Sequence, residues 1–277
     1  MDKHAYLIIA HNNFLVLQSL LDALDDERND IYIHIDARVR QIPELKCTKS
    51  NLVIIPNRIH VHWGHVSQIK VEFLLFATAL ENGNYEYFHL LSGTHFPLHN
   101  QDSIHEFFNN RHGMSVVSPQ YWTREDVLYK LGLKHYFLAN ANSVGFFSHV
   151  CNILWRLSMR LQPKSQKRAD RLFHGKFSQW LSLSHSDLLR ILPYKRDVLR
   201  KFKYSFCGDE LFMPYIFHKA GIKPFEFSKL LFQNFVGASP KNIDSDDFKS
   251  LVNSGFMFAR KFSDNDLNII DRISSTY

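Results

Sequence analysis

The chain has 277 residues, of which 45% are hydrophobic and 22% are charged, a composition typical of an ordinary globular protein. No apolar run reaches the roughly 18 residues that a membrane-spanning helix needs, and the run from Ala5 to Ala10 is too short for a signal peptide. The net charge of +6 is local, because residues 156–176 carry seven basic residues and one acid. This pattern argues against a nucleic-acid-binding surface spread over the whole protein. Three widely spaced cysteines favour a reducing, cytoplasmic compartment.

Strand-like and helix-like segments alternate in the first 120 residues. A mainly parallel sheet with helices on both faces is therefore expected. Ser67 is expected to cap one of these helices. The predicted strands are 6–10, 31–35, 52–55, 87–91 and 114–117, and the predicted helices are 14–24, 67–80 and 104–108.

Polar or small residues follow several of these strands. Ligands of parallel sheets bind beyond the carboxyl ends of the strands, so these positions are candidate binding residues. They are His11, Asp36, Trp63, Ser92 and Gly93.

The alternation fades after about residue 120. Residues 133–176 are expected to be irregular and then helical and basic, residues 180–192 to form a strand and a helix, and residues 207–218 to form a helix that opens with acids. No internal repeat is present. The sequence therefore predicts one α/β domain, 1–277, with a C-terminal extension.

Residues 256–262 read Phe-Met-Phe-Ala-Arg-Lys-Phe, so the cations Arg260 and Lys261 stand in an apolar frame. Lys and Arg are rarely buried without a partner, and this pair therefore suggests a site for an anion such as a diphosphate. The alternative is a strand edge with two solvated charges.

Asp209 and Glu210 stand together at the start of a predicted helix. One acid in the first turn is explained by the helix dipole, and helix capping accounts for Asp209. Glu210 is then the better candidate for a general base.

The segment from His60 to His65 contains three histidines that could ligate zinc. The chain has 16 histidines, however, and no carboxylate or cysteine completes the set nearby, so a substrate-lining loop around Trp63 and Gly64 is favoured. The two Asp-x-Asp strings, 244–246 and 264–266, are interpreted as solvated turns. No metal ion or other cofactor is expected.

Taken in order, the motifs resemble those of the core-2/I-branching N-acetylglucosaminyltransferase and peptide O-xylosyltransferase family, in a short bacterial form. The matching segments span nearly the whole chain, and the motifs are specific only in combination. The motifs are Trp63-Gly64-x-x-Ser67, Leu91-Ser92-Gly93-x-x-x-Pro97, Asp209-Glu210 and Phe258-Ala259-Arg260-Lys261-Phe262.

The resemblance implies a GT-A-like fold, a UDP-sugar donor, and inversion at the anomeric carbon without metal. It implies that Glu210 deprotonates the acceptor hydroxyl and that Lys261, with Arg260, neutralises the leaving diphosphate. Residues 1–120 would form the nucleotide-binding half, with Asp36 and His11 at the donor, and residues 121–277 the acceptor and diphosphate half. The residues expected to line the substrate cleft are Trp63, Gly64, Ser92, Gly93, His95, Trp180, Ser182 and Asp209.

Two positions depart from the family pattern. The family usually has an acid at the position of His95, and many relatives have an arginine where this chain reads Leu230-Leu231-Phe232-Gln233. Acceptor recognition is therefore expected to differ, or activity to be reduced.

The favoured function is transfer of GlcNAc from a UDP-sugar to a hydroxyl of a glycan or lipid-linked oligosaccharide, in the synthesis of a surface polysaccharide. UDP-xylose is the second donor. The alternatives are a catalytically inactive sugar-nucleotide-binding relative and a metal hydrolase that uses His60, His62 and His65.

Residues 144–176 combine apolar residues at helical spacing with the basic run. They are expected to form a basic helical insertion that binds the inner, anionic face of a membrane. The alternative is an apolar stripe packed on the core with a solvated basic loop.

Overall fold

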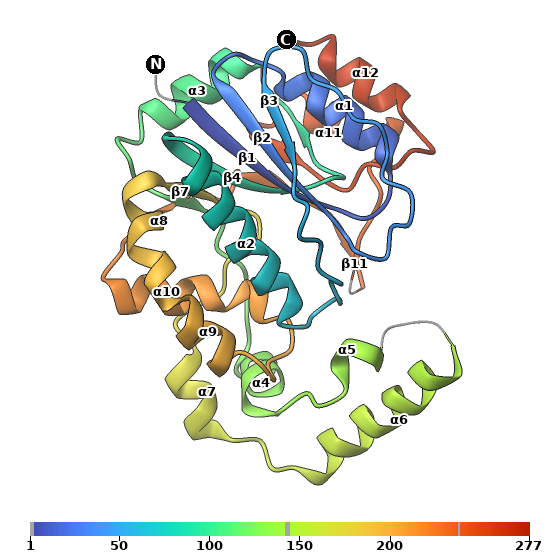
Figure 1. Ribbon diagram of the computed structural model, residues 1–277, viewed down its shortest axis with the longest axis vertical. Coiled ribbons are helices and arrows are strands. Elements are labelled where there is room, and N and C mark those ends of the chain that lie inside the picture. The colour runs from blue at the N-terminus through green and yellow to red at the C-terminus, as the bar shows by residue number, and fades with distance from the viewer. Residues whose placement is uncertain (1–2, 142–144, 238) are drawn as a thin grey trace.

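The computed structural model describes residues 3–141, 145–237 and 239–277 (Figure 1). Its centre is a seven-stranded mixed sheet in the order β3-β2-β1-β4-β7-β6-β8. Pairing is parallel from β3 to β4 and between β6 and β8, whereas β7 is antiparallel to both of its neighbours. The strands are β1 Lys3–Ala10, β2 Asn29–Ile35, β3 Asn51–Ile54, β4 Tyr85–Ser92, β6 Val116–Val117, β7 Ser182–Ser184 and β8 Phe225–Glu226.

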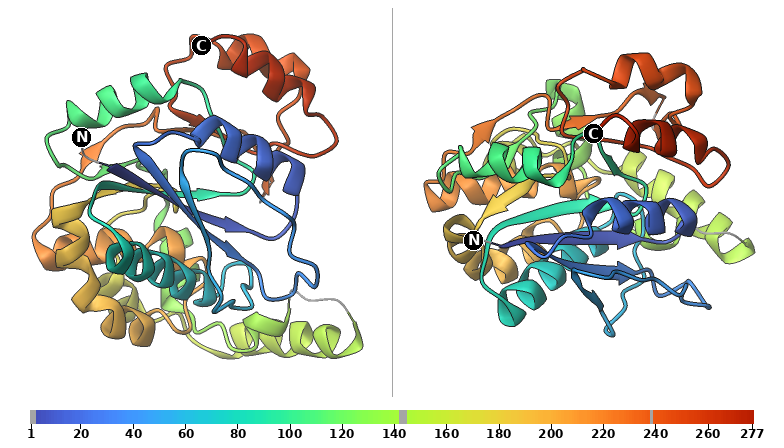
Figure 2. Two further views of the ribbon diagram at one scale, coloured as in Figure 1. Left: turned by 45° about the horizontal axis from the view of Figure 1, so that its top comes forward. Right: turned by 90° about the horizontal axis from the view of Figure 1, so that it is seen from above.

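Helices cover both faces of this sheet, as the alternation predicts (Figure 2). Helices α1, α3 and α12 lie on one face, and α2, α8, α9 and α10 lie on the other (Figure 1). This confirms the expected α/β class. The bounds are α1 Phe14–Leu24, α2 Ser67–Asn82, α3 Gln101–Asn109, α8 His185–Ile191, α9 Lys195–Lys201, α10 Phe212–Ala220 and α12 Asn268–Ser274.

The parallel half of the sheet forms because its strands are apolar on both faces. Every residue of β2 is buried, and β1 is buried from His4 to Ile8. Helix α2 packs Ile69, Phe73 and Phe76 into the same core. These buried strands hold their polar carboxyl-terminal residues at one edge of the sheet.

Two local predictions are wrong. Ser67 does not cap α2: it is the first helical residue, and its hydroxyl accepts a hydrogen bond from the His62 amide instead. The segment 207–218 is also not one helix. Cys207 has a positive φ of 46°, a short 3₁₀ turn covers Gly208–Glu210, and α10 begins only at Phe212.

The segment between β6 and β7 forms a chain of short helices at the bottom of Figure 1. A π-helical turn, Leu128–Gly132, follows the first of them. The predicted basic insertion 144–176 contains two of these helices, and its first residue, Val144, lies outside the described residues. The bounds are α4 Arg124–Val127, α5 Leu138–Ala141, α6 Phe146–Leu161 and α7 Gln166–Leu172.

The C-terminal extension has an apolar cluster of its own, packed against α1. Its strand β12 (Phe258–Ala259) lies between β5 (Phe96–Pro97) and β9 (Leu231–Phe232) in a three-stranded sheet. The strand-edge alternative for 256–262 is therefore wrong, because β12 is the central strand. The remaining elements are β10 Phe235–Val236, β11 Ser239–Pro240 and α11 Phe248–Leu251.

Within the described ranges, none of the helices has the length and apolar character that crossing a membrane requires. Cys47, Cys151 and Cys207 are free thiols.

Candidate functional site

A cleft of about 400 Å³ opens at the carboxyl ends of β1, β2 and β4. It is the position at which open α/β sheets bind ligands. Gly93 has a local role here, because a Cβ atom at this position would lie 2.9 Å from that of Ala10, so only glycine lets the two strand ends approach. The predicted site residues that line the cleft are His11, Asp36, Trp63, Ser92, Gly93, Trp180, Asp209, Glu210, Arg260 and Lys261.

Three predicted lining residues do not line this cleft. The backbone of Gly64 joins its loop to neighbouring segments: its amide donates to the Gln68 side chain and its carbonyl accepts from the Cys207 amide. Ser182 is buried in β7, where its hydroxyl contacts His89 Nδ1 at 2.8 Å. His95 is buried as well, and its Nδ1 contacts the Ser92 hydroxyl at 2.7 Å.

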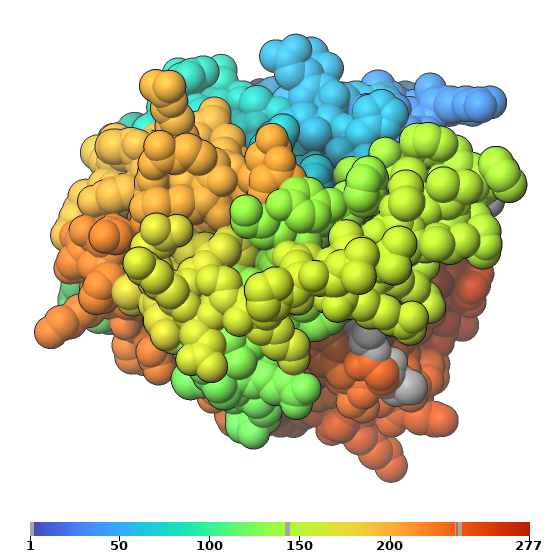
Figure 3. Space-filling view, turned by 90° about the horizontal axis from the view of Figure 1, so that it is seen from below, coloured from blue at the N-terminus to red at the C-terminus, as the bar shows by residue number. Residues whose placement is uncertain are grey.

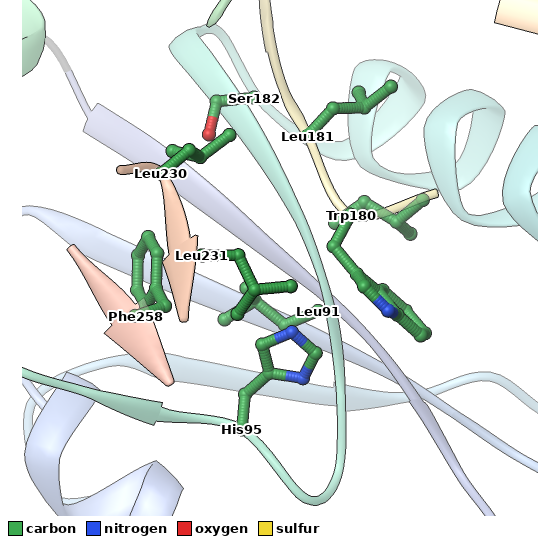
Figure 4. Close-up of a pocket in the computed structure, with 9 residues that line it drawn as sticks. Leu91, His95, Trp180, Leu181, Ser182, Leu230, Leu231 and Phe258 are labelled. Carbon is green, nitrogen blue, oxygen red and sulfur yellow. The ribbon is translucent and has the colours of Figure 1, made fainter. Parts of the chain in front are cut away.

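His95 and Ser182 instead line a second, small pocket of about 10 Å³ behind the cleft (Figure 4). Leu230 and Leu231 line the same pocket, so the two departures from the family pattern meet there. Burial, with the charge of Arg260, keeps the pKa of His95 well below its usual range. At the two departures from the family pattern, His95 and Leu230-Leu231, the chain therefore carries neutral side chains in an apolar pocket, where an isolated charge would be costly.

One end of the cleft is built around Asp36, directly after β2. Burial alone would raise the pKa of this carboxyl group, but hydrogen bonds from the Arg38 guanidinium and from the Arg38 and Val61 amides lower it to about 2. Asp36 is therefore an ionised, fixed acceptor. His11 faces it, and burial, with the charges of Lys261, Arg38 and Arg260, lowers the pKa of His11.

The same cleft carries Arg260 and Lys261, directly after β12. The Arg260 guanidinium lies over the Trp180 ring at 5.1 Å. Burial lowers its pKa to about 10, so it remains charged at neutral pH. Its Nε is buried and has no hydrogen-bond partner among the described residues.

Glu210 lies at the same cleft and is held by two lysines. Its Oε2 accepts a 2.6 Å hydrogen bond from Lys130 and lies 3.4 Å from Lys176 Nζ. Asp126 is 3.6 Å and 3.7 Å from the two ammonium groups and balances the second positive charge. Burial opposes the charge on Lys130, yet Glu210 raises the pKa of that lysine above its ordinary value. The two ammonium groups thereby hold the Glu210 side chain in place.

Asp209 is more buried than Glu210 and differs from it chemically. Burial and the neighbouring Glu210 charge raise the pKa of Asp209 to about 7, and its Oδ1 has no hydrogen-bond partner within the described ranges. Glu72 of α2 lies below it, fully buried, and accepts a 2.9 Å hydrogen bond from Gln179. Burial and the Asp209 charge raise the pKa of Glu72 well above its usual range.

The histidine cluster does not form a metal site. His65 Nδ1 is 3.1 Å from the Ser67 hydroxyl, and the His62 and His65 rings are perpendicular at 6.0 Å. In residues 3–141, 145–237 and 239–277, no three or more His, Cys, Asp or Glu side chains are grouped to hold a metal ion. The geometry gives no support to the metal-hydrolase alternative.

Several residues of the cleft and of the Glu210 ion-pair cluster were not predicted from the sequence. Lys130 is separated from Glu210 by 80 positions, so no local sequence pattern predicts their ion pair. Lys176 was counted with the surface basic run. Polar amides were also missed, since one sequence shows no pattern for them. The additional lining residues include Asn12, Arg38, His62, Gln68, Gln120, Gln179 and Gln233.

Comparison with known proteins gives the family. No curated protein matches the chain at a significant level. Among solved structures, the chain is similar to the apo form of mouse xyloside xylosyltransferase 1, with 12% identity and a TM-score of 0.44 over 94% of this chain and 97% of that one. Residues 4–226 match the Core-2/I-Branching enzyme family. Because the family match spans far more than half of the chain, the chain belongs to the Core-2/I-Branching enzyme family and is a glycosyltransferase.

Proposed function

We propose that the protein is an inverting, metal-independent glycosyltransferase that moves GlcNAc from UDP-GlcNAc to a hydroxyl group of a glycan acceptor. The observation that carries the proposal is one cleft that holds a fixed carboxylate, Glu210, together with two cations, Arg260 and Lys261. UDP-xylose is the second candidate donor. We place the reaction in the cytoplasm, in the assembly of a surface polysaccharide.

The carboxylate and the cations would act at opposite ends of one displacement. Glu210 takes the proton of the acceptor hydroxyl, whose oxygen forms a bond to the anomeric carbon as the bond from that carbon to the UDP oxygen breaks. Inversion follows from this single in-line step. General-base catalysis of this kind contributes roughly 10²–10⁴-fold in rate. Lys130 and Lys176 are positioning residues that hold the Glu210 carboxylate.

The leaving group is UDP, which carries the bonding electron pair away as negative charge on its diphosphate. Arg260 and Lys261 line the cleft from one short segment. Fixed cations at the place where charge develops stabilise the transition state. We propose that this pair does the work that a divalent metal does in other nucleotide-sugar enzymes.

The proposed base is tested by Glu210→Gln. We expect turnover to fall by roughly 10²–10⁴-fold, while the affinity for UDP changes little, because the amide keeps the shape of the side chain. Glu226→Gln, in the exposed strand β8, is the matched control and should retain activity. Near wild-type turnover by purified Glu210→Gln would show that another group is the base.

The proposed diphosphate contact is tested by Lys261→Ala, with UDP and uridine titrated by calorimetry in the presence of EDTA. Losing a charge-assisted hydrogen bond costs about 1.5–3 kcal/mol, so UDP should weaken by roughly 10- to 150-fold and uridine hardly at all. Lys223→Ala, at an exposed position, is the control. Equal weakening of UDP and uridine would place Lys261 away from the phosphates.

Metal independence is tested by the activity of the wild type in EDTA, which should be retained. Wild-type activity that is lost in EDTA and regained with manganese would contradict metal independence.

The donor is tested separately by thermal shift. A ligand that binds the folded state stabilises it by mass action, so UDP-GlcNAc should raise Tm more than UDP-xylose at equal concentration. The reverse order would make UDP-xylose the donor.

A further inference from the structure

Helix α6 is oriented with its apolar side toward the solvent. Its buried residues are Ser148 and Cys151, whereas Phe146 and Leu161, at its two ends, are 86% and 76% exposed. In the space-filling view this helix is the yellow-green ridge on the surface (Figure 3). The exposed apolar side chains, here named the α6 apolar face, are Phe146, Phe147, Ile153, Leu154, Leu157 and Leu161.

Specific polar contacts hold α6 in this orientation. Trp155 Nε1 donates to His135 at 3.2 Å, and the Ser148 hydroxyl donates to the Asn140 carbonyl at 2.7 Å. At the end of the helix, Gln162 exchanges hydrogen bonds with the Lys134 backbone. The side of α6 that carries Ser148, Cys151 and Trp155 therefore faces the protein, and the alternative that the apolar stripe packs on the core is wrong.

Cations border the α6 apolar face. Arg156 and Arg160 are exposed on the flank of the helix, and the helix itself contains no acid. Further exposed cations follow the helix or lie on α7: Lys164, Lys167 and Arg171. Near these, Asp170 is paired with Arg124. An apolar stripe with a positive border matches the acyl chains and anionic headgroups of a lipid surface.

Not every cation of this segment faces outward. Arg168 donates to the carbonyl groups of Leu131 and Leu133, and Lys176 is part of the Glu210 site. Arg168 is therefore structural and Lys176 belongs to the Glu210 ion pairs, so substituting them would not test a surface.

We propose that the α6 apolar face binds the surface of an anionic lipid bilayer, with the helix lying in the interface. The 16 residues of α6 span about 24 Å at 1.5 Å per residue, and an interfacial helix of this kind buries its apolar side without crossing the bilayer. Both views of Figure 2 place α6 on the side toward which the strands of the parallel half point, which is the side of the cleft. This placement brings the cleft to a lipid-linked acceptor, a consequence that rests on the proposed function; the binding itself does not.

Flotation of the full chain with vesicles tests the binding. We expect the protein to float with vesicles that mix phosphatidylglycerol and phosphatidylcholine, to float far less with phosphatidylcholine alone, and to be released as salt rises, because about 1 M salt shortens the screening length to about 3 Å. Absence of binding at low salt would overturn the proposal. Equal binding to neutral vesicles would overturn its electrostatic part.

Two pairs of variants locate the binding. Leu154→Ser with Leu157→Ser should reduce binding by at least tenfold, while Leu189→Ser, at a position of α8 that is 51% exposed, should not. Arg156→Gln with Arg160→Gln should reduce binding by roughly 10- to 30-fold, while Lys195→Gln with Arg196→Gln, exposed on α9, should have little effect. Unchanged binding by both α6 pairs would overturn the proposal.

Activity and oligomeric state separate the possible outcomes. The Leu154→Ser and Leu157→Ser variant should keep wild-type turnover with a water-soluble acceptor, which shows that it is folded and that the cleft is intact. If light scattering shows a dimer of the wild type that this variant converts to a monomer, the α6 apolar face binds a second copy and the lipid proposal fails. Flotation measures lipid binding and does not require activity. A failure of the proposed function would therefore leave the flotation result interpretable.

Discussion

Helices α2 and α6 have the same length, 16 residues, and both are amphipathic in sequence, yet the structure orients them oppositely. Helix α2 buries Ile69, Phe73 and Phe76 against the sheet. Helix α6 buries Ser148 and Cys151 and turns its leucines outward. An amphipathic pattern therefore establishes that a helix has two unlike sides, but not which of them faces the protein.

The difference arises from the surfaces that the two helices meet. Helix α2 packs against a wide parallel sheet whose strands are apolar on both faces, so its apolar side is buried. Helix α6 meets a small surface that includes His135 and offers it hydrogen-bonding partners. The side of α6 that carries Ser148, Cys151 and Trp155 matches that surface, and the α6 apolar face is left exposed.

The largest expected effect distinguishes the two apolar sides directly. Phe73→Ala in α2 should lower the free energy of unfolding by about 3–5 kcal/mol, because Phe73 is fully buried beside Phe76 and Phe212. Leu157→Ala in α6, at a side chain 48% exposed, should change it by at most about 0.5 kcal/mol. Urea unfolding measures both. A loss above about 2 kcal/mol for Leu157→Ala would show that α6 packs through its leucines.

A second prediction uses acid to loosen α6. Burial, with the charge of Arg168, lowers the pKa of His135 from 6.5 to about 4. The folded protein keeps His135 neutral while the unfolded chain binds a proton, so this contribution to stability is complete above pH 6.5 and is lost as the pH falls toward 4. The loss amounts to at most about 3 kcal/mol. The protonated ring also cannot accept the Trp155 hydrogen bond.

Amide hydrogen exchange at pH 7 and pH 4.5, corrected for intrinsic rates, checks this prediction. From pH 7 to pH 4.5, the protection of residues 146–161 should fall more than that of residues 67–82, since the apolar packing of α2 does not titrate. His135→Gln should show a smaller acid-induced loss of stability than the wild type. Equal losses in the two proteins would contradict the assignment.

The smallest expected effect concerns the one acid that α2 buries. Burial and the Asp209 charge raise the pKa of Glu72, so the folded state keeps a proton that the unfolded chain releases above about pH 4.5. Stability is therefore lost as the pH rises, by at most about 1.4 kcal/mol per pH unit. Glu72→Gln keeps the hydrogen bond to Gln179 and should flatten this dependence between pH 5 and 7, with little change at pH 5. Parallel curves for variant and wild type, measured by urea unfolding, would show that Glu72 does not titrate there.

The parallel half of the fold could be predicted because its signals are local. Strands β1, β2 and β4 are mostly apolar runs that end at polar or small residues, and α2 has apolar residues at helical spacing. The failures lie where tertiary contacts override such signals. The Ser67 hydroxyl accepts a hydrogen bond from the preceding loop instead of capping the helix. The positive φ of Cys207 starts a 3₁₀ turn that holds Asp209 and Glu210 and is separate from α10.

The site was predicted where a motif carried it and missed where only folding brings residues together. Glu210 and the Arg260-Lys261 pair line the same cleft, as the motifs indicate. Lys130 could not be found, because its contact with Glu210 joins distant segments. His95, which follows β4, and Ser182, the first residue of β7, turn into the small pocket rather than the cleft. Position along a strand predicts nearness to a site, but not the direction of a side chain.

The contact between Asp264 and the start of α1 has a consequence for the order in which the protein can mature on the ribosome. The Asp264 amide donates to the Asn13 side chain, and the Asp264 carboxylate accepts from the Val16 amide. The loop that carries His11 is thus fastened by a segment synthesised some 250 residues later. During translation the His11 side of the cleft stays unfastened until residue 264 has emerged, so a nascent chain that already has its parallel strands should not yet retain the proposed ligand, UDP.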